Sequence, residues 1–125
     1  MAEYIRCAAG SGKFLIEAYA LPCGRDWTVS VFGGELPHVG AVSLGQYEPV
    51  RESATVSTVT VHTHRDDVIA ANFAKRLAAG LKCTVTVSVG IHVDSAGASE
   101  LAALTTNCED CLQALLKEME VQGCD

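Results

Sequence analysis

The sequence has few of the features of a secreted, membrane-spanning or nucleic-acid-binding chain. Its longest apolar runs are far short of the roughly 20 residues that a membrane span needs, and the segment from Met1 to Cys7 lacks the basic-then-apolar layout of a signal peptide. With 9 basic against 15 acidic residues, the net charge is −6, whereas nucleic-acid-binding surfaces are basic. We therefore expect a cytoplasmic protein with no membrane span and no nucleic-acid partner.

Motifs of nucleophilic catalysis are also missing. The sequence has no Gly-x-Ser-x-Gly elbow, and Cys7, Cys23 and Cys83 have no histidine partner in their sequence context. Six cysteines in 125 residues without an export signal are more typical of reduced thiols than of a disulfide scaffold. The residues favour binding over catalysis.

The composition is typical of one globular domain that spans residues 1–125. Hydrophobic residues make up 49% of the chain and charged residues 19%, which is enough apolar material for a single core. Runs that alternate apolar and polar residues predict strands. The predicted strands cover residues 3–9, 14–21, 27–32, 38–45, 54–61 and 83–89.

Two helices are predicted in the second half of the chain. The first runs from Thr63, its N-terminal cap, to about Gly80, and Asp66 and Asp67 fall in its first turn, where the helix dipole favours acidic residues. The second runs from about Ser99 to Val121. Apolar residues at helical spacing define one buried face on each. They are Ile69, Phe73 and Leu77 on the first helix and Leu101, Leu104, Cys108, Cys111, Leu115 and Met119 on the second. A strand, a helix and a strand in succession fit either a parallel crossover or an α+β layer.

Two short motifs have alternative interpretations. The segment Gly10 to Lys13 resembles a phosphate-binding loop, but it lacks the first glycine of that pattern and no helix follows, so we interpret it as a turn. Cys108 and Cys111 form a C-x-x-C pair. Redox pairs lie at helix N-termini, whereas these cysteines fall in mid-helix on the apolar face, which favours core packing over redox or metal chemistry.

All four histidines lie at the ends of predicted elements, and this distribution indicates a site. If the last three predicted strands are neighbours, His38, His64 and His92 meet at one end of the sheet, where imidazoles can bind a metal, a heteroaromatic ring or a proton. Asp94 follows His92 by two residues on an extended chain, so it points the same way and can orient a histidine or ligate a metal. Arg65, beside the free amides of a helix start, is the best phosphate anchor in the chain.

Each of these residues also has a purely structural interpretation. A histidine at a strand end is commonly a capped polar group, Arg65 fits a solvated surface charge, and Asp94 fits a side chain that caps its own loop. Three histidines at element ends together favour a shared site over these separate explanations.

Three blocks of the sequence resemble motifs of one known family, in the same order and at compatible spacing. Pro37–Gly45 is similar to a His-Ile-Gly-Ala-Val block, the segment at His64 to a His-Lys-Glu/Asp-Asp segment, and Gly90–Asp94 to a Gly-Ile-His-x-Asp block. These are motifs of the LpdD-like prenylated flavin chaperones, the small proteins associated with UbiD-type gallate and hydroxyarylic acid decarboxylases. The resemblance runs from about residue 33 to about residue 107. Arg65 stands where the family has a lysine, so the positive charge is retained.

The resemblance implies a fold and a function. The fold is a single α+β domain similar to proteasome-assembly chaperones, with a mainly antiparallel sheet of about six strands and two helices packed on it, in a protein that forms a homodimer. The function is to bind prenylated FMN and deliver it to a UbiD-type decarboxylase without catalysis. Arg65 and the helix start would bind the flavin phosphate, and Gly40 and Ala41 would let the ring approach the sheet.

The same resemblance implies roles for the remaining polar residues, and two other functions stay open. His38, His64, His92 and Asp94 would bind the polar edge of the cofactor, or the three histidines would hold a divalent metal. The alternatives are a small metal-dependent enzyme or accessory decarboxylase subunit that uses these four residues, and an assembly scaffold with no ligand.

Overall fold

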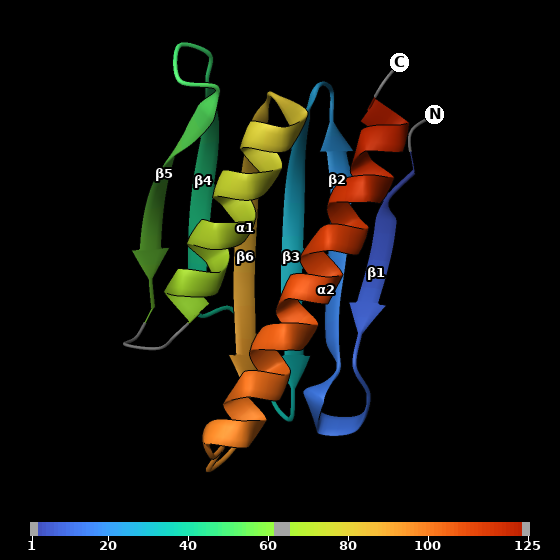
Figure 1. The fold of residues 1–125 in the computed structure, drawn as a ribbon, viewed down its shortest axis with the longest axis vertical. Helices are drawn as coiled ribbons and strands as arrows, with labels where there is room; N and C mark the ends of the chain where they lie inside the picture. The colour runs from blue at the N-terminus through green and yellow to red at the C-terminus, as the bar shows by residue number, and fades with distance from the viewer. Residues whose placement is uncertain (1–2, 62–65, 124–125) are drawn as a thin grey trace.

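The alternating segments of the sequence form six strands in a computed structural model that describes residues 3–61 and 66–123. Two α-helices and one 3-10 turn make up the other elements of these described residues, and Figure 1 labels every strand and α-helix. In chain order the elements are β1 (Ile5–Ala9), η1 (Gly12–Phe14), β2 (Ile16–Cys23), β3 (Asp26–Gly34), β4 (Ala41–Glu48), β5 (Ser53–Thr60), α1 (Asp66–Leu81), β6 (Thr84–His92) and α2 (Ala98–Gly123).

The strands form one sheet in the order β1-β2-β3-β6-β4-β5. Every neighbouring pair is antiparallel except β3 and β6, which run parallel with Gly34 opposite His92. The predicted α+β domain with a mainly antiparallel sheet is therefore confirmed. The last three predicted strands are indeed neighbours, because β4 lies between β6 and β5.

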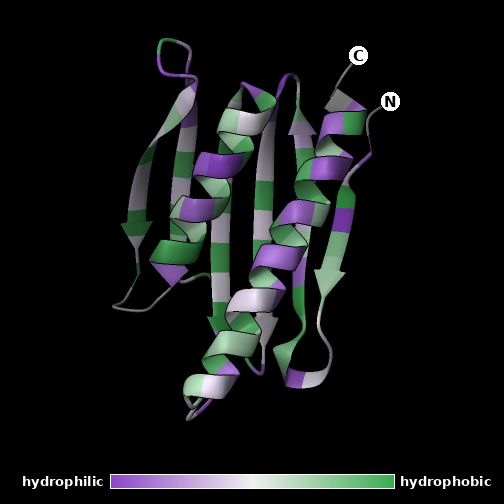
Figure 2. Ribbon diagram, in the orientation of Figure 1, coloured by the Kyte–Doolittle hydropathy of each residue, from purple (hydrophilic) through white to green (hydrophobic). Residues whose placement is uncertain are grey.

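Both helices pack on the same face of the sheet, which gives a two-layer structure (Figure 1). Helix α1 contacts β4, β5 and β6, and α2 contacts β1 and β2. Figure 2 shows hydrophobic residues alternating with residues of intermediate hydropathy along the central strands, as expected for strands with one buried face. Valines of β3 and β6 form the centre of the core. They are Val29, Val31, Val85, Val87 and Val89. No helix in residues 3–61 or 66–123 is long and apolar enough to cross a membrane.

The predicted helix faces are the ones that the structure buries. Phe73 and Leu77 of α1 are buried, and Ile69 is partly buried against the core. On α2 the core residues include every predicted position except Leu101, which is partly buried. Cys108 and Cys111 belong to this buried set, so their predicted role in core packing is confirmed.

The strand boundaries near the candidate site differ from the predicted ones. The strand predicted from His38 begins at Ala41, and β6 continues past Val89 to His92. The segment before β4 crosses close to β6, and Gly40 N–H donates a hydrogen bond to Val89 O at 2.8 Å. This non-local contact sets the strand ends, which local alternation does not encode.

The segment from Gly10 to Lys13 forms the turn that the sequence predicts. Gly10 and Gly12 have φ angles of 85° and 60°, which glycine adopts without strain. The 3-10 turn η1 begins within this segment at Gly12, and β2 comes next, so no α-helix begins here to direct its amides at a phosphate.

Candidate functional site

The candidate site lies where β6 ends beside the first turn of α1, and its centre is the carboxylate of Asp66. Asp66 is the first residue of α1 and is only 3% exposed. Its Oδ1 accepts a hydrogen bond from Ile91 N–H at 3.2 Å, which ties the helix start to β6. Its Oδ2 lies 3.2 Å from Nε2 of His38 but has no aligned hydrogen-bond donor among the described residues. A buried carboxylate oxygen in this state favours the approach of a further donor.

Two glycines make room for this arrangement. A Cβ atom on Gly40 would overlap Asp66 Oδ2 and come within 3.0 Å of His38 Nε2. A Cβ atom on Gly90 would overlap the backbone carbonyl of His38. The absence of side chains at these positions lets the segment before β4 pack directly against β6 and the start of α1.

The two described histidines each pair with a different carboxylate. His38 Nδ1 lies 3.0 Å from Leu36 O, and its Nε2 faces Asp66. His92 Nε2 lies 2.6 Å from Asp94 Oδ1, in a partly exposed pair. His38 and His92 are thus held at one end of the sheet, as the sequence suggests, but their ring nitrogens are directed to separate acids.

Backbone hydrogen bonds fix the loop that carries Asp94. Asp94 N–H donates to Glu35 Oε1 at 2.9 Å, and Glu35 N–H donates to His92 O at 2.7 Å. The loop after β6 is therefore tied to the end of β3, its parallel neighbour, and the acidic side chain of Glu35 is held beside the backbone of Asp94.

Asp66 and His92 line a cavity of about 180 Å³ whose walls are otherwise mainly apolar. The remaining lining residues come from α1, the end of β6, the loop after β6 and the first turns of α2. They are Ile69, Ile91, Val93, Ala96, Leu101, Leu104 and Thr105. The cavity therefore offers apolar packing surface and one buried acceptor, which suits a flat molecule with an N–H group on its edge.

Two of the predicted site residues are buried, and two others fall outside the described part of the chain. Gly40 and Ala41 are buried, and Gly40 lies against the Asp66 carboxylate. His64 and Arg65, together with the predicted cap Thr63, lie outside the described residues. Cofactor contacts by all of these residues stay predictions.

The predicted histidine metal cluster is not supported. Within residues 3–61 and 66–123, no group of three or more His, Cys, Asp or Glu side chains is arranged to hold a metal ion. The physical reason is that His38 and His92 are engaged by different carboxylates instead of converging on one point.

Sequence reasoning places Asp66 correctly in the first turn of α1 but does not predict its burial. An acid in the first turn of a helix ordinarily remains solvated and interacts with the helix dipole. The signal for its burial is the pair of glycines within strand-like segments, Gly40 and Gly90, because a glycine in a strand commonly marks close approach of another group.

Burial also decides the chemistry of the C-x-x-C pair. Loss of solvation is the largest effect on both thiols and raises the pKa of Cys108 and of Cys111 to about 12. Both are therefore protonated at neutral pH, which does not suit thiolate redox chemistry or metal binding.

Comparison with known proteins identifies the family. Residues 10–120 match the prenylated flavin chaperone LpdD-like domain. The chain belongs to this family. The match covers all residues of the candidate site described above and extends beyond the three motif blocks on both sides.

One curated relative and one solved structure support the assignment. Protein LpdD of Lactiplantibacillus plantarum (strain ATCC BAA-793 / NCIMB 8826 / WCFS1) is 25% identical over 107 residues, which cover 86% of this chain and 79% of the relative. The fold is similar to that in the crystal structure of a chaperone complex for yeast 20S proteasome assembly, with a TM-score of 0.63 and 16% identity. That similarity covers 94% of this chain and 97% of the other. The LpdD-like domain thus has the predicted proteasome-assembly-chaperone fold.

Proposed function

We propose that this protein binds prenylated FMN in the Asp66 cavity and delivers it to a UbiD-type decarboxylase, without catalysing a reaction itself. The observation that carries the proposal is a buried carboxylate oxygen in an apolar cavity, with no aligned donor among the described residues, inside the segment that matches the LpdD-like family. The family match suggests the class of cargo, and the cavity suggests how that cargo is recognised.

The polarity of the cavity favours one end of the cofactor. The pyrimidine edge of a flavin ring carries an N–H donor, and Asp66 Oδ2 offers an acceptor in an apolar environment, where such a hydrogen bond to a charged group is strong. The phosphate group would be repelled by Asp66, Asp94 and Glu35. We therefore propose that the ring edge lies at Asp66 and that Arg65, next to Asp66 in sequence, binds the phosphate.

The remaining residues of the site are proposed to form its rim. His92, paired with Asp94, lines the cavity, and His38 Nε2 lies 3.2 Å from Asp66 Oδ2. Gly40 lies against the Asp66 carboxylate and Ala41 follows it at the start of β4, and both are proposed to let the ring approach the sheet. A rim that is partly exposed allows cargo to leave, which delivery to a decarboxylase requires.

The test is to produce the protein together with a flavin prenyltransferase, purify it and record its absorbance spectrum. We expect about one prenylated FMN per chain, and we expect an apo-decarboxylase to gain activity when the loaded protein is added. A colourless protein, or a loaded protein that never transfers cargo, would contradict the proposal.

A matched pair of variants tests the role of Asp66 in the same experiment. In Asp66→Asn the Oδ1 bond to Ile91 is retained, but an amide N–H₂ faces the ring N–H, so we expect cofactor retention to fall about tenfold or more. Asp67→Asn is the control, because the Asp67 side chain accepts a hydrogen bond only from the adjacent Val68 N–H among the described residues. Equal retention by Asp66→Asn and wild type would remove Asp66 from the site.

We also propose that the protein forms a homodimer through the sheet face that carries no helix. This face exposes large apolar side chains, with Leu21 55% exposed, Val42 40% and Val59 73%. The rings of Tyr19 and Phe32 stack on it with centroids 5.7 Å apart. Aromatic residues of this kind are enriched at protein interfaces, and a two-fold symmetric contact between copies of one surface is the commonest arrangement of a homodimer.

A further inference from the structure

A second cavity lies between the two helices and adjoins the Asp66 cavity. It has a volume of about 340 Å³ and is lined by Val68, Ile69, Asn72, Phe73, Thr105, Cys108 and Glu109. Ile69 and Thr105 line both cavities. The two spaces are therefore neighbours, and we call the second one the interhelical groove.

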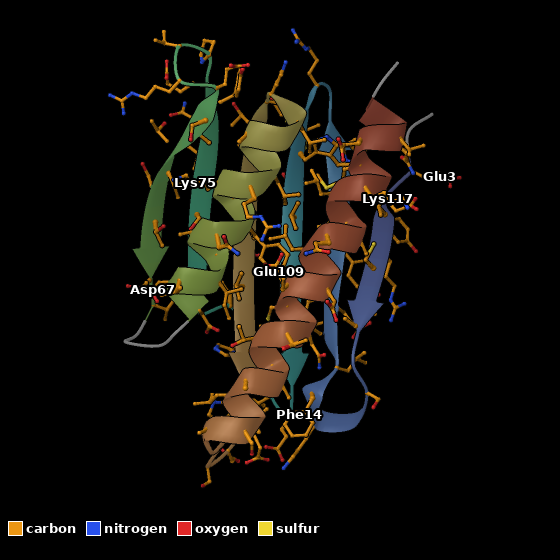
Figure 3. The ribbon with its side chains drawn as sticks, in the orientation of Figure 1. Glu3, Phe14, Asp67, Lys75, Glu109 and Lys117 are labelled. Atoms are coloured by element: carbon orange, nitrogen blue, oxygen red, sulfur yellow. The ribbon has the colours of Figure 1, made fainter. Side chains whose placement is uncertain are left out.

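Beyond one end of the groove, toward the end of α1, the two helices contact each other. A Cβ atom on Gly80 of α1 would lie 3.1 Å from Leu116 of α2, so the helices are close there. One turn nearer to the groove, Arg76 Nη1 contacts both carboxylate oxygens of Glu109 at 2.6 and 2.7 Å. Figure 3 shows Glu109 between α1 and α2. The Arg76–Glu109 pair closes one end of the groove, and the open end leads toward Asp66.

The base of the groove is apolar. Phe73 is 1% exposed and Cys108 is 6% exposed, and the Cys108 thiol is neutral at physiological pH. On the rim, Val68 presents an apolar side chain to solvent, and Thr105 Oγ1 is already engaged because it donates a hydrogen bond to Leu101 O at 2.9 Å. The groove therefore offers packing surface to an apolar ring more than it offers hydrogen bonds.

The two cavities together match a ligand with one polar and one apolar edge. Asp66 and Phe73 are seven residues apart on α1, which corresponds to about 10 Å along the helix axis, the length scale of three fused rings. A flavin ring has a pyrimidine edge with an N–H group and, at the other end, a benzene ring that carries two methyl groups. The buried acceptor and the apolar groove are separated in the same way.

We propose that the interhelical groove holds the methyl-bearing edge of the flavin ring while Asp66 holds the pyrimidine edge, so that the ring lies between α1 and α2. This inference rests on the proposed function and adds the orientation of the cargo. The helix pair, and not the open face of the sheet, is then the surface through which cargo enters and leaves.

The experiment fills the groove at its junction with the Asp66 cavity. Thr105→Phe places a ring where both cavities meet, and Thr106→Phe, at the next exposed position of α2, is the matched control. After co-production with the prenyltransferase, we expect Thr105→Phe to retain prenylated FMN about tenfold less than wild type, because overpacking excludes the ring, and Thr106→Phe to retain it normally. Lumichrome, a flavin ring without the sugar phosphate, should show the same difference in a fluorescence titration.

The possible results separate the inference from the function. If wild type and both variants retain the cofactor equally, the groove is not the ring site, although the proposed function stands. If wild type retains none, the proposed function is wrong. The buried Trp27 reports folding by its fluorescence, and Asn72→Phe, at an exposed position of α1 in the groove, gives an independent variant if Thr105→Phe does not fold. Normal retention by folded Asn72→Phe overturns the inference.

Discussion

At the scale of single residues, the sequence predicts the neighbourhood of the site but not its centre. His38, His92 and Asp94 are identifiable because polar residues that follow apolar strands come to the end of a sheet. Asp66 is not, because its burial depends on Gly40 and Gly90, which are distant in sequence and pack around it only in the folded chain. The spacing of apolar residues on α2, in contrast, is local information and is sufficient to place Cys108 and Cys111 in the core.

The buried thiols predict how stability depends on pH. Burial raises the pKa of Cys108 and of Cys111 to about 12, whereas a cysteine in the unfolded chain ionises at about pH 8.5. Above that pH the unfolded state loses these protons while the folded state keeps them. The contribution of both thiols to the free energy of unfolding is therefore complete below about pH 8.5 and is lost as pH rises toward 12.

Urea unfolding at a series of pH values measures this effect. We expect the free energy of unfolding to fall between about pH 9 and 12, and to fall less steeply in the double variant Cys108→Ala, Cys111→Ala. That variant should be less stable than wild type at neutral pH because it leaves cavities in the core. Parallel pH curves for the two proteins would show that these thiols do not titrate as described.

At the scale of elements, alternation predicts each strand, and non-local contacts set where the strands stop. Along β6 the valines at every second position are buried, as the sequence indicates. The extension of β6 to His92 follows from its pairing with the end of β3, since Gly34 lies opposite His92. The sequence encodes this pairing only through the packing of whole elements, so a strand-by-strand reading ends β6 too early.

Gly90 of β6 affects both the packing of the strand and the position of His38 in the site. A Cβ atom there would overlap the carbonyl of His38, so we expect Gly90→Ala to lower the free energy of unfolding by about 2 kcal/mol or more through backbone displacement. Gly97→Ala is the control, because the nearest atom to its added Cβ is Glu100 Oε1 at 3.9 Å, and its effect should be within about 0.5 kcal/mol.

Urea unfolding followed by Trp27 fluorescence measures both glycine variants. We also expect Gly90→Ala to retain less prenylated FMN, since the displaced segment carries His38 away from Asp66. A Gly90→Ala protein as stable as Gly97→Ala would mean that the segment before β4 does not pack against β6 as described.

At the scale of the whole molecule, the order of the strands is the property that the sequence does not reveal. The last strand, β6, is inserted in the middle of the sheet between β3 and β4, and it pairs in parallel on one side and antiparallel on the other. Neighbours along the chain are therefore not always neighbours in the sheet. This insertion brings the end of β6 beside the start of α1, and in the described part of the chain one face of the sheet carries no helix (Figure 1).

The sheet face that carries no helix is the surface through which we expect two copies of the protein to associate. Val42 and Val59 are directly opposed on β4 and β5, and on β1 Arg6 joins the aromatic cluster, with its guanidinium 6.0 Å from the Tyr19 ring centre. Between these two groups β6 presents the small residues Thr84, Thr86 and Ser88, which permit close approach of a second sheet. We expect light scattering to give a mass of twice 13.1 kDa.

A charge placed on this face should break the dimer because it would be buried without a partner. We expect Val42→Glu to give a folded monomer and to shift the dimer dissociation constant by about a hundredfold or more. Val50→Glu adds the same charge in the loop between β4 and β5, where Val50 is 88% exposed, and should stay dimeric. A wild-type monomer at high protein concentration, or a dimer that survives Val42→Glu, would contradict the use of this face.

Since the Asp66 cavity and the interhelical groove lie on the helix side, Val42→Glu should still retain prenylated FMN, so that assembly and cargo binding are separable in one protein.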